Sequence, residues 1–267
     1  MTLIKLGGIM AEDSRLIIAL ADEVKTIMDS DEHVLIVHGG GIVISELQQC
    51  WGITPRFKEG LRQTSPREMP LIDMALAGAV NKRLVRLFYS RGLAAWGLCG
   101  ADAGVLTGTS IAPGEADNRT GTVCSVNTDP IRLLIRGAYL PIFAPPSMNK
   151  QGEALNINAD EAAFSLASSL TANRLIFLSD VPGIIRNNVV LPELAPDGCN
   201  ELIKEKIVTD GMVPKLQAAV NSLHAGVSAV HIASYTEAGS LKRILSGETG
   251  TAIRKMIPKG TSKKVIC

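Results

Sequence analysis

Short apolar runs alternate along this chain with longer stretches of helical spacing, and this alternation restricts the possible folds more than any other feature. The runs that predict strands are "TLIKLG", "HVLIVHG", "AAWGL", "LPIFA", "RLIFLS" and "AVHIA". The stretches that predict helices are 14–28, 41–51, 70–90, 159–170 and 214–225. Strands that alternate with helices predict the α/β class, with a mostly parallel open sheet and helices on both of its faces.

Length, charge and cysteine usage exclude several classes of protein. The 267 residues contain no internal repeat, and they suit one large α/β domain or two lobes that share a sheet, with the weakest boundary near residues 170–174. The formal net charge of +1 predicts no general attraction to nucleic acid or to a membrane surface. No signal peptide or membrane span is predicted. Five scattered cysteines without C-x-x-C spacing favour a reduced, cytoplasmic protein.

Two glycine clusters follow predicted strands, namely "KLGG" (Lys5 to Gly8) and "HGGG" (His38 to Gly41). Ligands of open α/β sheets bind beyond the carboxyl ends of the strands. Glycine lets backbone N–H groups approach a ligand closely, and such groups in front of a helix favour anions. A tight turn would explain one cluster alone, but two clusters, one with Lys5, favour an anion site. For His38 a structural hydrogen bond is the favoured role.

Several common site motifs are absent from the sequence. It has neither the G-x-x-x-x-G-K-[ST] of a P-loop nor a G-x-G-x-x-G that opens a βαβ unit. It also lacks the G-x-S-x-G of a nucleophile elbow. The four histidines have no metal-ligand spacing, so no metal site on the protein is predicted.

Charged residues lie near two predicted helix starts. In "NINADEAAFSLASSL" Asn158 is expected to cap the helix, and Glu161 is expected to complete a capping box. Asp160 in the first turn suits the helix dipole, or it organises nearby lysines. In "VTDGMVPKLQAA" Lys215 lies early in a helix, where a lysine opposes the dipole. A solvated surface lysine is the alternative interpretation.

Taken together, these segments resemble the amino-acid kinase superfamily and, within it, the N-acetylglutamate kinase family. The resemblance covers roughly residues 3–256, and the motifs that carry it in the family's order are "IKLGG", "IVHGGG", "EGLRQT", "ALAGAVNKRLV", "LNINADEAA", "LSDVPGI" and "TDGMVPKL". It implies a three-layer αβα sandwich. It also implies a single kinase domain (1–258) with a substrate and dimer lobe (about 1–172), an ATP lobe (about 173–258) and a tail (259–267).

The resemblance also implies roles for individual residues. Lys5 and Lys215 would neutralise the phosphoryl group during transfer, and Asp160 would organise the two lysines. The backbone N–H groups of Gly8 and Gly41 would donate to the same group. The implied acceptor contacts are Gly40, Gly41, Arg62, Asn156 and Asn158, with Arg62 on the α-carboxylate. The implied nucleotide contacts are Asp180, Val181, Pro182, Gly183, Ile184, Ile185, Ile207, Val208 and Thr209. The helix over 71–90 would form a homodimer contact.

The implied reaction is ATP-dependent phosphorylation of the γ-carboxylate of N-acetyl-L-glutamate to N-acetyl-L-glutamyl 5-phosphate in arginine biosynthesis. Mg²⁺ would arrive with the nucleotide. A glutamate side chain has a reference pKa of about 4.3, so the acceptor is already ionised near neutral pH and needs no general base. Such a reaction needs neither a catalytic histidine nor a catalytic serine.

Some positions depart from the family's usual pattern, and they leave other acceptors open. "GLRQTS" stands where "GLRVTD" is common, and Ala101 and Ala103 replace residues that are often lysine and glycine. Alternative acceptors are an acyl-aminoadipate, glutamate, carbamate or UMP, although Arg62 argues against carbamate, which has no α-carboxylate. A non-catalytic relative is a further alternative, disfavoured because both lysines and Asp160 are present. No arginine feedback is expected.

Overall fold

The computed structural model describes residues 1–7, 9–112, 114–115, 117–208 and 212–255. Its centre is an eight-stranded sheet with the order β14-β16-β15-β11-β1-β2-β8-β5. The strands are β1 (Thr2–Leu6), β2 (Val34–His38), β5 (Ala95–Cys99), β8 (Leu140–Ala144), β11 (Arg174–Ser179), β14 (Glu193–Leu194), β15 (Ala229–Ser234) and β16 (Thr251–Arg254). Every predicted strand lies in this sheet. All neighbouring strands pair in parallel except β15 and β16, which are antiparallel.

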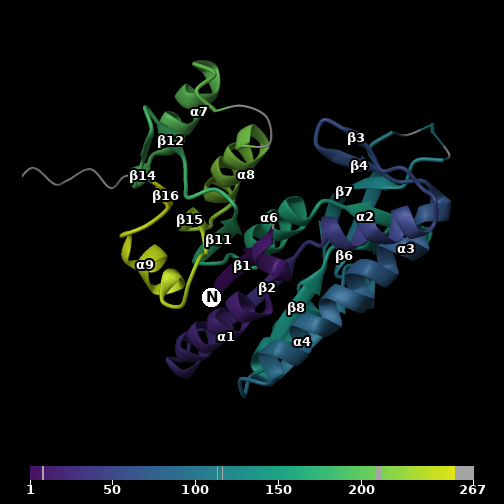
Figure 1. The fold of residues 1–267 in the computed structure, drawn as a ribbon, viewed down its shortest axis with the longest axis horizontal. Coiled ribbons are helices and arrows are strands. Elements are labelled where there is room, and N and C mark those ends of the chain that lie inside the picture. Colours follow the sequence, from purple (N-terminus) through teal and green to yellow (C-terminus); the bar gives the residue numbers. More distant parts are fainter. Residues whose placement is uncertain (8, 113, 116, 209–211, 256–267) are drawn as a thin grey trace, which may run out of the picture.

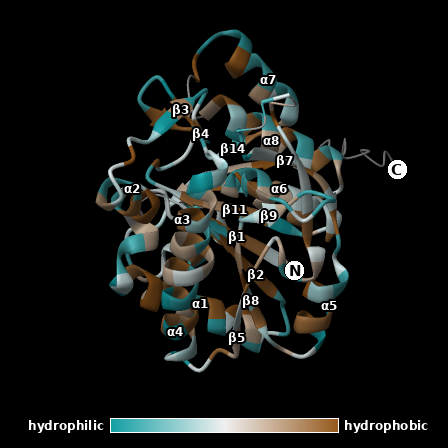
Figure 2. Ribbon diagram, turned by 90° about the vertical axis from the view of Figure 1, so that its right-hand side faces the viewer, coloured by the Kyte–Doolittle hydropathy of each residue, from teal (hydrophilic) through white to brown (hydrophobic). Residues whose placement is uncertain are grey.

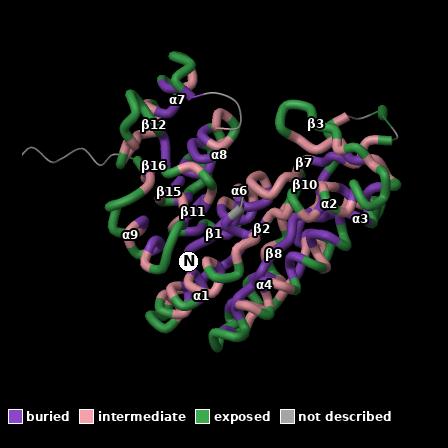
Figure 3. The backbone as a smooth tube through the Cα atoms, in the orientation of Figure 1, coloured by how far each residue is buried: buried purple, intermediate pink, exposed green. Residues whose placement is uncertain are grey.

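Helices cover both faces of the sheet, as Figure 1 shows, so the expected three-layer αβα sandwich is confirmed. One face packs against α1 (Ser14–Asp29), α4 (Asn81–Tyr89) and α9 (Ser240–Ser246). The other face packs against α5 (Asp129–Arg136), α6 (Ala159–Ser169), α7 (Pro196–Lys204) and α8 (Met212–His224). Figures 2 and 3 show that the hydrophobic and the buried residues gather on the central strands between these two layers.

Strand β1 lies in the middle of the sheet and contributes side chains to both faces. Leu3 belongs to the apolar cluster under α6 and α8, whereas Ile4 and Leu6 belong to the cluster under α1. Because side chains alternate between the faces of a strand, Lys5 points to the same face as Leu3. The one charged residue of β1 therefore faces α6 and α8.

The helix predicted over 70–90 is divided into three parts. It consists of α3 (Met69–Asp73), a π-helical stretch over Met74–Val80, and α4. The wider π-helical turns place Leu76 and Val80 against the glycine turn that precedes α2 (Gly41–Cys50). An apolar spacing of three and four residues cannot reveal such a widening, because it averages over both kinds of turn.

Several short elements were not predicted. Strands β6 (Leu106–Ser110), β7 (Thr120–Val126), β9 (Ser147–Met148) and β10 (Ala154–Ile157) close into a small barrel. Two hairpins pair β3 (Arg56–Lys58) with β4 (Leu61–Gln63), and β12 (Ile185–Arg186) with β13 (Val189–Val190). No strand was predicted over the segment that contains β7. Within the described ranges, no helix is both long enough and apolar enough to cross a membrane.

Candidate active site

Lys5, Asp160 and Lys215 meet at the carboxyl end of β1. The Nζ atom of Lys5 lies 2.7 Å from Oδ1 of Asp160, and the Nζ atom of Lys215 lies 2.8 Å from Oδ2 of the same carboxylate. The side chain of Lys5 on β1 is 11% exposed, that of Asp160 on α6 is 23% exposed, and that of Lys215 on α8 is 22% exposed. The predicted convergence of the two lysines is confirmed, and the alternative that Lys215 is a solvated surface lysine is wrong.

The first turn of α6 fixes the position of Asp160. The side chain of Asn158 caps the helix, since its Oδ1 accepts from the backbone N–H groups of Asp160 at 2.8 Å and Glu161 at 3.4 Å. The predicted cap is therefore confirmed. The predicted capping box is wrong, because the Glu161 carboxylate accepts from Val123 N at 2.7 Å and from the Thr122 hydroxyl. Donors of β7 compete successfully for this carboxylate.

The charges of the lysines control the ionisation of Asp160. Burial alone would raise the pKa of its carboxyl, but the neighbouring ammonium groups of Lys5 and Lys215 outweigh burial and lower the pKa. The carboxylate is therefore ionised in the folded protein. Gly7 packs directly against this cluster, because a Cβ atom on it would lie 2.7 Å from Nζ of Lys5. Gly8, which was predicted to donate to the phosphoryl group, lies outside the described residues.

The second glycine cluster joins β2 to α2. A Cβ atom on Gly40, whose φ is 154°, would lie 2.7 Å from Cδ2 of Leu76, so the turn needs glycine for packing as well as for any ligand. His38 is fully buried, and its Nδ1–H donates to Gly39 O at 2.7 Å while its Nε2 accepts from Asn81 at 3.1 Å. Burial lowers the pKa of His38 to about 4. The imidazole is therefore neutral, and its two hydrogen bonds agree with the predicted structural role.

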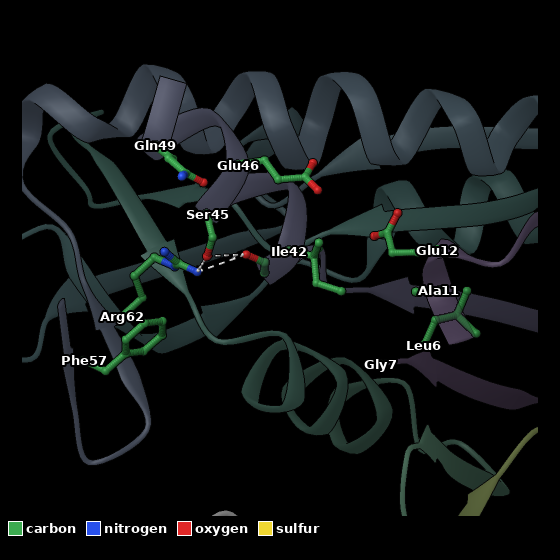
Figure 4. Close-up of a pocket in the computed structure, with 12 residues that line it drawn as sticks. Leu6, Gly7, Ala11, Glu12, Ile42, Ser45, Glu46, Gln49, Phe57 and Arg62 are labelled. Atoms are coloured by element: carbon green, nitrogen blue, oxygen red, sulfur yellow. Dashed lines mark hydrogen bonds between the residues drawn. The ribbon is translucent and has the colours of Figure 1, made fainter. Parts of the chain in front are cut away.

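Two pockets lie beside this turn. The smaller, about 190 Å³, is lined by all of the predicted acceptor contacts: Gly40, Gly41, Arg62, Asn156 and Asn158. The larger, about 550 Å³, shares the glycine turn and Arg62 with the smaller one and extends along α2 to Gly7 and Glu12 (Figure 4). The structure thus brings the predicted acceptor residues together from three separate segments of the chain.

Arg62 lies between the hairpin β3–β4 and α2. Its Nη2 donates to Gly41 O at 3.1 Å and to Ser45 Oγ at 2.9 Å, and its Nη1 donates to Gln48 Oε1 (Figure 4 draws the first two contacts). Its guanidinium also stacks over the Phe57 ring, 4.8 Å from the centroid. Burial lowers the pKa of this guanidinium from its ordinary value. Sequence reasoning missed Ser45, Gln48 and Phe57.

The predicted nucleotide residues lie around the ends of β11 and α8, and they line neither pocket. Asp180 and Pro182 are exposed, whereas Gly183 and Ile184 are buried, and Ile184 N donates to Thr251 Oγ1 at 2.8 Å. Val181 is partly buried and Val208 is buried, whereas Ile185 and Ile207 are exposed. Thr209 lies outside the described residues. The buried residues Ile184 and Val208 belong to the apolar core and anchor these two segments to it.

In the part of the chain that the structure describes, no group of three or more histidine, cysteine, aspartate or glutamate side chains is placed to hold a metal ion.

Comparison with known proteins assigns the family. The amino acid kinase family matches residues 1–234. The chain belongs to the amino acid kinase family. Among the curated relatives of this kinase, the acetylglutamate kinase of Geobacillus thermodenitrificans is 33% identical over 258 residues, which are 95% of this chain and 96% of the relative. The acetylglutamate kinase of Koribacter versatilis is 38% identical over 239 residues, which are 89% of this chain and 92% of the relative.

The fold of this kinase also matches solved structures. The protein smu.665 of Streptococcus mutans UA159 superposes with a TM-score of 0.81 at 28% identity, and the match covers 96% of this chain and 98% of that chain. The resemblance inferred from the ordered motifs, to the N-acetylglutamate kinases, is therefore confirmed.

Proposed function

We propose that this kinase transfers the γ-phosphoryl group of ATP to the γ-carboxylate of N-acetyl-L-glutamate. The product is N-acetyl-L-glutamyl 5-phosphate, an intermediate of arginine biosynthesis. The observation that carries the proposal is the pair of lysines held on opposite oxygens of Asp160. The names of the curated relatives support the choice of acceptor.

The chemistry of the acceptor explains why such a cluster suffices. A carboxylate is already a nucleophile near neutral pH, so the reaction needs no base. The obstacle is the repulsion between an anionic nucleophile and an anionic phosphate, and phosphoryl transfer depends mainly on positioning and charge stabilisation. Lys5 and Lys215 together outweigh the charge of Asp160 by one positive charge. We assign them to the oxygens of the phosphoryl group in transfer, with the backbone N–H groups of Gly8 and Gly41.

The smaller pocket suits N-acetylglutamate. The Arg62 guanidinium matches an α-carboxylate, which it can bind through two parallel hydrogen bonds. Asn156 donates from Nδ2 to Thr64 Oγ1 at 2.8 Å, which leaves its Oδ1 to accept from the amide N–H of the acceptor. Ile44, Leu76 and Ile157 supply an apolar wall for the acetyl methyl and the methylene groups.

We assign the nucleotide to the segments 180–185 and 207–209. Because the described residues offer no cluster of three ligating side chains, we infer that Mg²⁺ enters with ATP, held by its phosphates. The ion would supply neutralisation of phosphate charge. Lys5 and Lys215 then act on the oxygens that develop charge during transfer.

The arrangement of the elements supports two lobes, about 1–172 for the acceptor and about 173–258 for ATP. The expected tail, 259–267, lies outside the described residues. In Figure 1, α6 lies between α7–α9 on one side and α2–α4 on the other. We also propose a homodimer through the helical segment 71–90, which exposes the large apolar side chains of Met74 and Tyr89. A cytoplasmic location agrees with Cys50, Cys99, Cys124 and Cys199, all of which are free.

A hydroxamate assay tests the proposed reaction. Hydroxylamine traps the acyl phosphate formed from ATP and one acid of a panel: N-acetylglutamate, glutamate, aspartate or N-acetyl-aminoadipate. We expect turnover of N-acetylglutamate alone. Faster turnover of the aminoadipate analogue would replace the acceptor, and turnover of none of the acids would contradict kinase activity of this kind.

A further inference from the structure

One face of α2 holds the guanidinium of Arg62. The three groups that accept from it are Gly41 O, Ser45 Oγ and Gln48 Oε1, which are four and three residues apart along the helix. Residues with this spacing lie on the same face of an α-helix. The orientation of the guanidinium relative to the smaller pocket is therefore set by α2, although Arg62 itself belongs to β4.

The amide of Gln48 has a single possible orientation. Gln48 is 0% exposed, and its Nε2 donates to Glu68 Oε1 at 2.6 Å. An ionised carboxylate can only accept hydrogen bonds, so Nε2 must face Glu68 and Oε1 must face Arg62. The other oxygen of Glu68 accepts from the Ser65 backbone N–H at 2.7 Å and from the Ser65 hydroxyl at 2.6 Å. Ser65 therefore holds the Glu68 carboxylate, Glu68 orients the Gln48 amide, and Gln48 holds the Arg62 guanidinium.

The charge of Glu68 is maintained although only 6% of the residue is exposed. Burial would raise the pKa of its carboxyl, but hydrogen bonds from Ser65 and Gln48 lower it below its ordinary value. A buried charge is costly unless it is paired and hydrogen-bonded. The hydrogen bonds that join Ser65, Glu68, Gln48 and Arg62 form a relay, and Arg62 is the cation at its other end. The charge of Glu68 counteracts the effect of burial on the pKa of the Arg62 guanidinium.

We propose that Gln48 and Glu68 are positioning residues, which act through Arg62 to orient its guanidinium for the α-carboxylate of the acceptor. This inference rests on the proposed function. A long flexible side chain loses conformational freedom when it binds, and orienting it beforehand reduces that loss. Disruption of the relay should therefore weaken acceptor binding and leave phosphoryl transfer unchanged.

The test compares Glu68→Gln and Gln48→Leu with the unmodified chain. In Glu68→Gln the new amide can donate to Gln48, so the Gln48 amide is free to turn its Nε2 toward Arg62. Two donors then face each other, and the hydrogen bond from Arg62 to Gln48 is lost. In Gln48→Leu both hydrogen bonds disappear. For each variant we expect the KM for N-acetylglutamate to rise about 10-fold or more, with kcat and the KM for ATP within about 2-fold. Titration calorimetry should show the same weakening of acceptor binding.

A matched control separates positioning from a general loss of stability. Glu23 is another carboxylate with several donors, since it accepts from the Tyr235 hydroxyl at 2.6 Å, Gly239 N at 3.0 Å and Lys242 N at 2.9 Å. It lines neither pocket. Glu23→Gln should lower the Tm without raising the KM for N-acetylglutamate.

A double-variant cycle shows whether the relay acts through Arg62. In an Arg62→Lys background, Gln48→Leu should add little to the KM, because the bond it removes has already gone. The inference is overturned if the effects of Gln48→Leu and Arg62→Lys on the KM for N-acetylglutamate are fully additive. It is also overturned if both single variants of the relay are active and keep the KM of the unmodified chain. Either result leaves the proposed function standing. Absence of turnover by the unmodified chain overturns both.

Discussion

Replacement of Lys215 with alanine removes one of the two ammonium groups bound to Asp160. The cluster then changes from one excess positive charge to none, because Lys5 and Asp160 neutralise each other. At the 2.8 Å separation of Lys215 Nζ and Asp160 Oδ2, the attraction between unit charges is about 6 kcal/mol for an effective dielectric constant near 20. A phosphoryl oxygen at that distance would gain at most a similar amount.

The expected loss is smaller than this, since the Lys215 side chain remains 22% exposed and water screens part of the interaction. Loss of one charge-stabilising donor typically lowers the rate by about 10²–10³-fold. We therefore expect Lys215→Ala to lower kcat by at least about 10²-fold, measured at saturating ATP and N-acetylglutamate.

The matched control is Lys25→Ala. Lys25 also pairs with an aspartate, Asp29, at 2.9 Å, but this pair is on the exposed surface of α1. Its loss should leave kcat unchanged. If Lys215→Ala retained the kcat of the unmodified enzyme, the role assigned to the lysine pair would be refuted.

Three further tests, one of them with a matched control variant, give distinct outcomes. Gly7→Ala places a Cβ atom 2.7 Å from Nζ of Lys5, so it should displace the ammonium and lower kcat by on the order of 10²-fold with little change in Tm. Asn158→Ala should cost about 1 kcal/mol of unfolding free energy, as should Asp13→Ala at the equivalent cap of α1, but only the former should lower turnover. The folded pKa of His38, about 4, lies below its ordinary value of 6.5, so its contribution to stability is present above pH 6.5 and is lost as the pH falls toward 4. Denaturant unfolding measures the fall in unfolding free energy between pH 8 and pH 4. This fall should be about 3 kcal/mol smaller in His38→Gln than in the unmodified chain.

The central layers of the fold could be predicted because burial on both faces leaves a strong pattern. Strands such as β8 and β11 are continuous apolar runs, as expected where helices cover both faces of a parallel sheet. The barrel strands β9 and β10 have two and four residues, too few to show any period. Their pairing depends on contacts with β6 and β7, which sequence spacing does not contain.

From the residues alone, the site was predictable only where local sequence determines position; the resemblance to the family supplied the lysine pair and the acceptor residues. Asn158 and Asp160 were identified because a cap and a first helical turn are local features. The capping box failed at Glu161, since a backbone N–H of β7 binds the same carboxylate. Gln48 and Glu68 were missed because each looks like an ordinary polar residue, and only their contact, 20 positions apart in the chain, gives them a role.

In the proposed reaction, the Asp160 carboxylate has a second role, because it holds the two lysines in place before any substrate binds. Two ammonium groups gathered for an anionic phosphoryl group repel each other when no substrate is bound. Asp160 binds one on each oxygen, and the lysines lower the pKa of its carboxyl in return, so the carboxylate stays ionised without a ligand. The geometry is therefore set before the phosphoryl group arrives. Donors fixed in this way stabilise developing charge without reorganisation during the chemical step, and their advantage over water depends on that property.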